Sequence, residues 1–150
     1  LAHSHTNLLY HIVFSTKDRR PLIGPDIAGR LHEYLGGGIR GEGGAAIAIN
    51  GTADHVHILA RLRQDKTLSD VLRGIKANSS KWVKDLFPAN QRFAWQSGYG
   101  AFTVSESQVE RVGAYIRDQE TPHRRQTFEE EFVALLKAHG IAFDPKYVWT

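Results

Sequence analysis

The sequence predicts an α+β fold of the ferredoxin-like (split βαβ) type, in which an antiparallel sheet carries helices on one face. The expected elements follow the order β-α-β-β-α-β, and an Asn-Gly pair separates two apolar runs, which is a strong hairpin signal. Two further helices are expected after the fourth strand. With 150 residues the chain has the length of one domain, so we expect residues 1–150 to form a single unit.

The first strand and the first helix are expected in the N-terminal third. Residues 7–17, NLLYHIVFSTK, are rich in β-branched and aromatic side chains and therefore predict a strand. Apolar side chains then recur every four residues over 25–35, which predicts a helix. The glycine-rich segments at 36–38 and 41–44 are expected to end this helix, at about Leu35 or at the latest near Arg40.

The second and third strands, at residues 45–50 and 53–62, are expected to form a hairpin. Asn50 and Gly51 stand between them and both tolerate positive φ. We therefore expect this pair to make the turn.

Three later helices are marked by a hydroxyl residue that an acidic residue follows three positions later, the pattern of a capping box. These pairs are Thr67 with Asp70, Ser107 with Glu110, and Thr127 with Glu130. The three helices are expected to end near residues 86, 119 and 139. A fourth strand region, residues 93–105, is expected between the first two of them.

The composition excludes several kinds of chemistry. The chain has no cysteine, so it has no disulfide framework, no thiolate metal site and no cysteine nucleophile. No apolar run approaches the roughly 20 residues of a membrane helix, and the first residues lack the blocks of a signal peptide. We therefore expect a cytoplasmic protein with no membrane partner.

Two histidines, His55 and His57, are one residue apart in the second strand of the hairpin. Because side chains alternate across a strand, both imidazoles leave the same face, about 6.5–7 Å apart, while the residues on either side of His57 enter the core. The pair, beside Asp54, can be half of a metal site, and zinc, manganese and iron all suit imidazole. Surface or hydrogen-bonded histidines are the alternative interpretation. His11 on the first strand is not expected to touch a metal.

The segment YIRDQ places Tyr115 and Gln119 four residues apart on the third predicted helix, hence on one face of it. This face lies beside the apolar stripe of the helix, so the tyrosine can reach into a cleft. A tyrosine at the edge of the core with a solvated hydroxyl is the alternative.

Taken together, an HxH strand followed by a YxxxQ helix in a cysteine-free domain resembles the HUH single-tyrosine transposases of the IS200-like class, which include REP-associated tyrosine transposases. The resemblance runs through nearly the whole chain. It includes YHIVFSTKDRR, NGTADHVHIL, FAWQSGYGAF, YIRDQE, TFEEEFVALLKAHGI and the C-terminal YVW.

The resemblance implies an enzyme that nicks and rejoins single-stranded DNA at hairpin-flanked ends through a 5′-phosphotyrosine. Tyr115 would be the nucleophile, and His55, His57 and Gln119 would hold a divalent metal, Mg²⁺ or Mn²⁺. Family members are dimers in which the tyrosine helix of one subunit completes the histidine site of the other. Pro122, just after the motif, would stiffen the exit from the helix.

Binding of a DNA strand requires a positive surface and stacking surfaces for unpaired bases. The formal net charge is only +3, but basic residues cluster along the chain. Trp82 and Trp95 are possible stacking platforms, although a core position suits each of them better. The candidate DNA-binding residues are Lys17, Arg19, Arg20, Lys76, Lys81, Lys84, Arg124 and Arg125.

Three other functions fit the same sequence. A domesticated relative could nick repeated palindromes without mobilising an element. A non-catalytic regulator could bind single strands on its sheet, and a hydrolase could use a metal-bound water in place of Tyr115.

Overall fold

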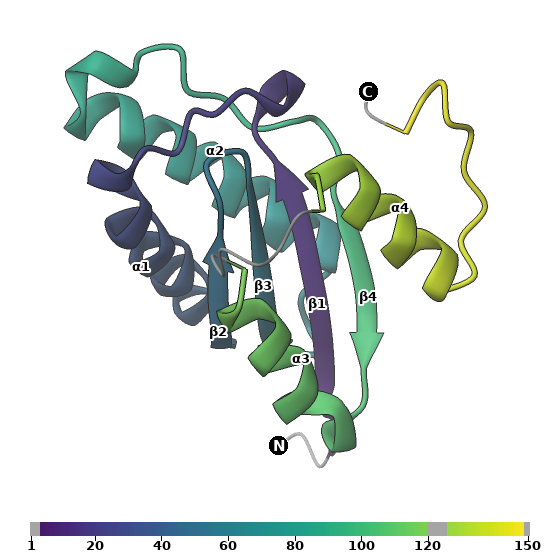
Figure 1. Cartoon of the computed structure of the whole chain (residues 1–150). Coiled ribbons are helices and arrows are strands. Elements are labelled where there is room, and N and C mark those ends of the chain that lie inside the picture. Colours follow the sequence, from purple (N-terminus) through teal and green to yellow (C-terminus); the bar gives the residue numbers. More distant parts are fainter. Residues whose placement is uncertain (1–3, 120–125, 149–150) are drawn as a thin grey trace.

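The computed structural model describes residues 4–119 and 126–148. Four strands form one antiparallel sheet in the order β2-β3-β1-β4 (Figure 1). The ferredoxin-like α+β prediction is confirmed by this order. The strands are β1 (Leu8–Ser15), β2 (Ala45–Gly51), β3 (His55–Leu62) and β4 (Gly100–Val104).

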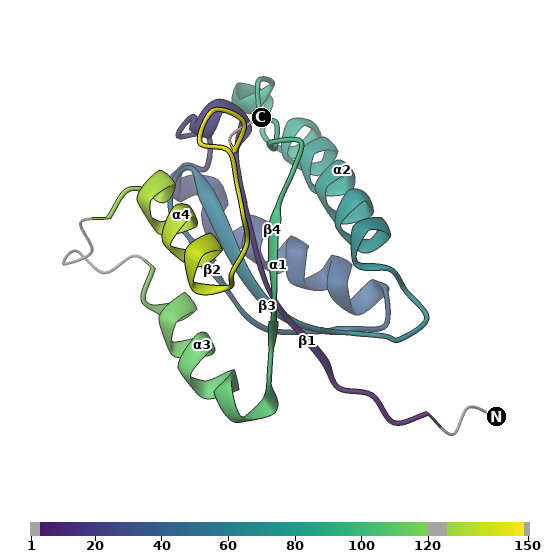
Figure 2. The ribbon, with the colours of Figure 1, turned by 90° about the vertical axis from the view of Figure 1, so that its right-hand side faces the viewer.

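The helices cover both faces of this sheet (Figure 2). The first pair, α1 (Pro25–Gly41) and α2 (Leu68–Leu86), covers one face, as expected for a split βαβ fold. The second pair, α3 (Val109–Arg117) and α4 (Phe128–Ala138), covers the other face. Three short 3₁₀ helices complete the described elements: η1 (Lys17–Arg19), η2 (Pro88–Asn90) and η3 (Glu106–Gln108). None of the helices within 4–119 and 126–148 combines the length and the apolar character that a membrane crossing requires.

Strand alternation divides the interior into separate cores. Ile12 and Phe14 of β1 pack with the core beneath α1 and α2, whereas Val13 packs with Phe132 and other side chains of α4. A smaller cluster around Ile116 packs α3 on the sheet. The strand predicted within residues 7–17 is therefore confirmed, with neighbouring side chains on opposite faces.

Helix α1 runs through the glycine triplet to Gly41. Two of these glycines lie at close helix contacts: a Cβ on Gly36 would be 3.4 Å from a methyl group of Ile49, and one on Gly38 would be 3.3 Å from Ile75. The left-handed residue comes later, at Gly43, with φ 82°. The earlier of the two expected ends, at residues 36–38, is therefore wrong, since these glycines serve packing and not termination, whereas the later end near Arg40 is confirmed to within one residue.

The hairpin is confirmed, but its turn is not where the sequence predicted it. Asn50 and Gly51 are paired inside the ladder, opposite His57 and Val56, and the chain reverses over residues 52–54. Gly51 is needed for a different reason than positive φ: a Cβ there would lie 2.1 Å from the carbonyl oxygen of His55. The glycine permits close approach of two backbones.

Two predictions about the C-terminal half are also wrong in detail. The strand predicted over 93–105 is confined to β4, and upstream of it Trp95 makes only an isolated bridge to Thr16. No capping box forms at Ser107, which lies in η3, so α3 starts two residues later and ends before Gln119. The caps at Thr67 and Thr127 are confirmed, since each hydroxyl accepts a backbone N–H of the residue three positions on.

Candidate active site

The two histidines of β3 lie on the sheet face that α3 and α4 cover. His55 is 4% exposed and His57 is fully buried, while Val56 between them enters the core on the other face. The prediction that the imidazoles share one face is confirmed. Their burial distinguishes them from solvated surface histidines.

A single carboxylate, that of Glu131 on α4, contacts all four side chains singled out in the sequence. Its Oε1 is 3.0 Å from His57 Nε2 and 3.3 Å from His55 Nε2. Its Oε2 accepts hydrogen bonds from the Tyr115 hydroxyl and from Gln119 Nε2, the latter at 3.2 Å. Tyr115 lies on α3 and Gln119 lies just after its end. Both thus meet the β3 histidines through Glu131 of α4.

The surroundings of Glu131 keep it ionised. Burial alone would raise its pKa, but hydrogen bonds with His55 and His57 outweigh burial and hold the pKa far below its usual range. The group at the centre of the cluster is therefore a carboxylate, which is a ligand type for divalent cations.

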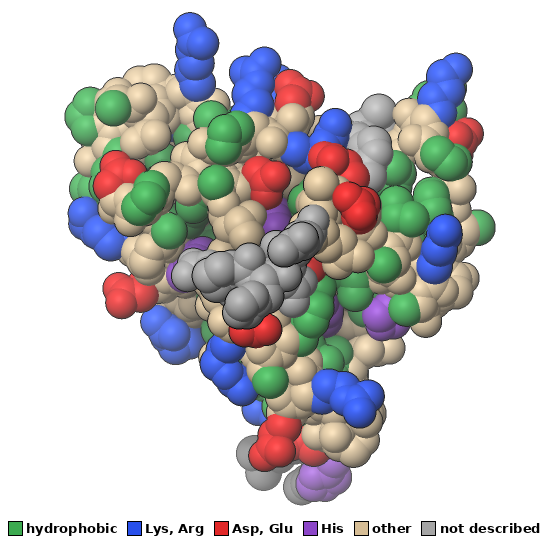
Figure 3. All heavy atoms as spheres, viewed as in Figure 1, with side chains coloured by type: hydrophobic (Ala, Val, Ile, Leu, Met, Phe, Trp, Pro, Cys, Tyr) green, Lys and Arg blue, Asp and Glu red, His purple; other side chains and the backbone are tan. Residues whose placement is uncertain are grey.

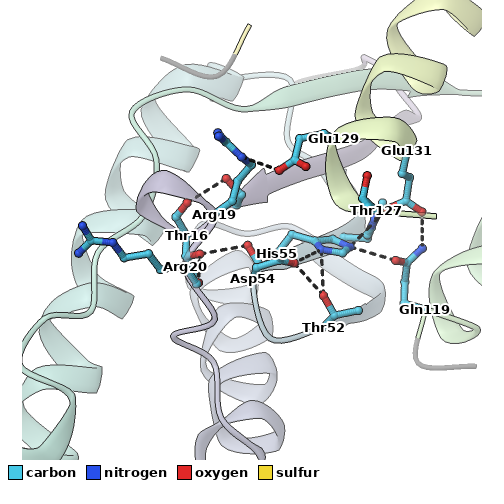
Figure 4. A network of polar contacts seen from close by, with 12 residues as sticks. Thr16, Arg19, Arg20, Thr52, Asp54, His55, Gln119, Thr127, Glu129 and Glu131 are labelled. Carbon is cyan, nitrogen blue, oxygen red and sulfur yellow. Dashed lines mark hydrogen bonds and ion pairs between the residues drawn. The ribbon is translucent and has the colours of Figure 1, made fainter. Parts of the chain in front are cut away.

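Figure 4 shows how the turn before β3 holds His55. Its Nδ1 is 2.8 Å from Asp54 Oδ1, and the Thr52 hydroxyl donates to the same carboxylate oxygen at 2.9 Å. The backbone carbonyl of Asp54 in turn accepts from the Thr16 backbone N–H at 2.9 Å. Burial lowers the pKa of His55, but hydrogen bonds to Asp54, Glu131 and Gln119 outweigh burial and raise it to about 9. Because Nδ1–H donates a hydrogen bond to Asp54, Nε2 is the nitrogen directed at the cluster.

His11 of β1 orients the second histidine. Its Nε2 is 2.8 Å from His57 Nδ1, and the two rings stack with centroids 5.1 Å apart. Burial, followed by the proximity of His57, lowers the pKa of His11 to about 3. A neutral His11 can accept the Nδ1 proton of His57, which leaves His57 Nε2 unprotonated for a metal. His11 does not belong to the group of convergent donor atoms, as the sequence predicted.

The donor atoms fit a divalent cation. Nitrogen or oxygen donors of His55, His57 and Glu131 lie within 4.8 Å of one another, and Gln119 Oε1 is 3.1 Å from His55 Nε2. Donors at right angles in an octahedral site with bonds of about 2.1 Å are about 3.0 Å apart. Both histidines also have the outer hydrogen-bond partner that metal-binding imidazoles require.

Tyr115 lies at the rim of this cluster. Its half-buried ring contacts His11 and His57 edge to face, with centroids 5.9 and 5.6 Å away. Its position in the last turns of α3 brings the hydroxyl to Glu131 within the same chain. Nucleophile and donor set are thus adjacent in one chain.

The basic residues predicted to bind DNA divide into two groups in space. Lys17, Arg19 and Arg20 follow β1 directly, next to the end of the sheet where Ser15 pairs with His55. The Arg19 guanidinium forms an ion pair with Glu129 of α4 at 2.6 Å, and the side chain of Arg20 is 60% exposed. This group borders the site.

The second group, Lys76, Lys81 and Lys84, lies on α2 across the sheet from the site. The Lys76 ammonium donates to the backbone carbonyls of Gln96 and Gly98 at 2.7 and 2.8 Å, and burial lowers its pKa to about 8. The Lys81 ammonium forms an ion pair at 2.5 Å with Asp85, one helical turn later. These lysines are not brought to the site. Arg124, Arg125 and Pro122 lie outside the described residues.

The tryptophans occupy the α1 and α2 face. Trp95 is 9% exposed and its Nε1 donates to Ser79 at 2.9 Å. Trp82 stacks on Tyr34 with centroids 4.7 Å apart. The core interpretation is therefore confirmed for Trp95, and Trp82 packs against the same core.

Sequence reasoning missed Glu131 and the role of His11. A signal for Glu131 was present, because Phe128, Phe132 and Leu136 form the buried stripe of α4 and position 131 lies on it. An acidic residue on the buried face of an amphipathic helix calls for a partner. For His11 the signal was its place in the buried first strand.

Comparison with known proteins assigns the chain to a class. The family model described as "Transposase IS200 like" matches residues 4–119. The match covers well over half of the chain, so the protein belongs to the IS200-like transposase family, whose members are enzymes of DNA strand transfer. This confirms the resemblance inferred from the sequence. The match ends at Gln119, so α4 and Glu131 lie beyond it.

Individual relatives agree with this assignment. The ISDra2 transposase TnpA of Deinococcus radiodurans is 24% identical over 117 residues, which cover 75% of this chain and 84% of the relative. A crystal structure of a candidate transposase from the same species has a TM-score of 0.64 at 23% identity, covering 79% of this chain and 95% of that one. A REP-associated tyrosine transposase bound to a REP hairpin has a TM-score of 0.59 at 16% identity, covering 96% of this chain and 91% of that one. The two structures show the shared fold.

Proposed function

We propose that the protein is a metal-dependent transposase that nicks and rejoins single-stranded DNA at hairpin-flanked ends through a 5′-phosphotyrosine on Tyr115. One observation carries the proposal: the Tyr115 hydroxyl and the His55, His57 and Gln119 side chains meet at the carboxylate of Glu131. A nucleophile and a set of metal donors are thus joined at one point.

The metal site would consist of His55, His57 and Gln119, as the family resemblance implies, with Glu131 as an additional ligand. Mg²⁺ or Mn²⁺ bound there would neutralise charge that develops on the phosphate during in-line displacement. Asp54 and His11 hold the two imidazoles so that each presents Nε2 to the site.

The reaction itself requires a deprotonated phenol. The Tyr115 hydroxyl donates to Glu131, so the carboxylate can take the proton as the phenolic oxygen attacks phosphorus. The new bond joins Tyr115 to the 5′-phosphate, the bond to the 3′-oxygen breaks, and Glu131 passes the phenolic proton to that oxygen, which becomes a 3′-hydroxyl. The phosphodiester energy is kept in the tyrosine ester, so another 3′-hydroxyl can reverse the step and join two strands.

The DNA partner is expected to be a hairpin with single-stranded flanks. A structural relative is described as bound to a REP hairpin, which supports this choice. Lys17, Arg19 and Arg20 border the site and suit the DNA backbone best among the predicted basic residues. The contributions of the α2 lysines and of Arg124 and Arg125 stay predictions, as do the single domain and the cytoplasmic location.

The homodimer that the family resemblance implies raises the question of which subunit supplies the tyrosine. Family members exchange tyrosine helices, whereas Tyr115 reaches Glu131 and the histidine site within one chain. We propose that each site works in cis, whether or not a dimer forms. Mixing Tyr115→Phe with His57→Ala would then restore no activity, whereas restored cleavage would show exchange.

The test of the function is incubation with labelled single-stranded hairpin DNA and Mn²⁺, followed by a denaturing gel. Wild-type protein and the control Tyr99→Phe, an exposed tyrosine, should retain the label covalently. Tyr115→Phe and His57→Ala should not. Cleavage that persists in Tyr115→Phe would replace the proposal with a metal-water nuclease, and binding without cleavage across a panel of hairpins would favour a regulator.

A further inference from the structure

A cavity of about 580 Å³ lies between α3 and α4 and opens directly onto Tyr115. Its walls are largely apolar, with Val104, Val112 and Leu135 among the lining side chains, while Gln108 and Arg111 also line it. Cavities of this size hold small organic ligands. The mechanism described above uses only Tyr115 and His11 of its walls.

The two sides of Tyr115 differ in charge. The cavity of about 320 Å³ at His55 and Gln119 is lined by the carboxylates of Asp54, Glu129 and Glu131. Figure 3 shows acidic side chains gathered at the start of α4, with hydrophobic side chains and a basic one farther along it. Among the described residues that line the α3/α4 cavity there is no carboxylate, and Arg111 and two histidines are present. The carboxylates of the first cavity call for a bound cation, whereas the second cavity offers the Arg111 guanidinium to the phosphates of a DNA strand without opposing carboxylates.

The lining also matches the chemistry of one nucleotide. An unpaired base has apolar faces and a polar edge, and proteins read it by packing and by hydrogen bonds to that edge. The aliphatic walls suit the faces, the amide of the exposed Gln108 suits the edge, and the Arg111 guanidinium suits a phosphate.

We propose that this cavity binds one unpaired nucleotide adjacent to the phosphodiester that Tyr115 attacks, and that Gln108 selects its base. The proposal rests on the proposed function, because it assigns the place of the substrate strand at the same tyrosine. It makes the α3/α4 cavity the specificity pocket of the enzyme and leaves the acidic cavity to the cation.

The experiment uses a pool of single-stranded DNA with a randomised segment, Mn²⁺ and the whole protein. Covalent adducts and released fragments are sequenced, which gives base preferences on both sides of the cleaved bond. With Gln108→Ala we expect the preference at one flanking position to fall about tenfold while the other positions keep theirs. The control Gln91→Ala, whose amide donates to the Lys84 backbone carbonyl of α2 and does not line this cavity, should leave every position unchanged.

A second pair of variants tests occupancy of the cavity. Leu135→Trp should fill it and lower the adduct rate by about tenfold or more, whereas Val133→Trp, on the same helix but lining a different surface hollow, should not. Both variants are first matched for melting temperature and for Mn²⁺ binding. If Leu135→Trp does not fold, the base preferences of Gln108→Ala, a substitution at the surface, test the proposal by themselves. Adduct formation with unaltered base preferences in Gln108→Ala would overturn the nucleotide pocket, and no adduct with wild-type protein would overturn the proposed function instead.

Discussion

The two faces of the sheet are built on different principles. Beneath α1 and α2, the interior is an aliphatic and aromatic core that includes Ile12, Leu72 and Phe93. Beneath α3 and α4, apolar clusters flank a buried network of histidine, tyrosine, glutamine and glutamate side chains. Burial of apolar area stabilises the first face. On the second face, burial of polar side chains would be unfavourable, but these side chains form hydrogen bonds with one another, which offsets the cost. One sheet thus separates stability from chemistry.

The strongest test of this comparison is removal of the central carboxylate. Glu131→Ala should weaken Mn²⁺ binding by about 100-fold or more, since loss of outer partners alone costs about 10- to 100-fold. It should also abolish covalent DNA adducts. Glu130→Ala is the matched control, because this neighbour bonds Thr127 at the helix start. Calorimetric titration with Mn²⁺ measures the difference, and equal affinities for the two variants would remove Glu131 from the metal site.

The opposite face should respond in stability and not in metal binding. Leu72→Ala deletes a fully buried side chain beneath α2 and should lower the free energy of unfolding by about 2–5 kcal/mol. Leu86→Ala, at a 45% exposed position of the same helix, should cost far less. Urea unfolding gives both values. If folded Leu72→Ala bound Mn²⁺ tenfold more weakly, the two faces would be coupled.

An intermediate effect is expected for His11, which touches the site only through His57. His11→Ala should weaken Mn²⁺ binding by about 10- to 100-fold, because His57 loses the partner that orients it. His11→Gln offers an acceptor at the same place and should recover part of the affinity. Rescue distinguishes orientation from packing: identical losses in the two variants would point to packing alone.

The smallest effect is the dependence of stability on pH in the metal-free protein. The pKa of His11 is lowered to about 3, so the unfolded chain takes up the proton first and stability falls as pH drops below about 6.5. The pKa of His55 is raised to about 9, so its contribution is full below about 6.5 and is lost as pH rises toward 9. The melting temperature in chelator should therefore peak near pH 6.5 between pH 5 and 9. His11→Gln should flatten the acid side of that curve, and an unchanged acid slope would contradict the assignment.

The parts of the molecule that local patterns control were predicted well. Alternation in β1 and β3 and the caps at Thr67 and Thr127 depend on neighbours within a few residues, so the sequence carries them directly. Two of the errors concern glycines that permit close packing, a role that the local pattern does not reveal. Gly51 serves backbone approach and not a turn, and Gly38 serves contact with α2 and not a helix end.

The same distinction explains the site. His55, His57, Tyr115 and Gln119 were identified because their spacing matches a known pattern. Glu131 was not, because its meeting with them depends on how α4 packs against the sheet, which short-range spacing does not determine. Among three consecutive glutamates, only the rotation of α4 about its axis decides which one is buried.

The order of the site residues along the chain has a consequence for biosynthesis. The histidines leave the ribosome first, the tyrosine follows, and Glu131 on α4 comes last. A nascent chain from which only the sheet and α3 have left the ribosome therefore lacks the Glu131 carboxylate, which the histidine, tyrosine and glutamine side chains of the site all contact. If Glu131 is required as proposed, cutting activity begins only after α4 has been synthesised, and a ribosome that stalls before α4 leaves a fragment that cannot nick the genome.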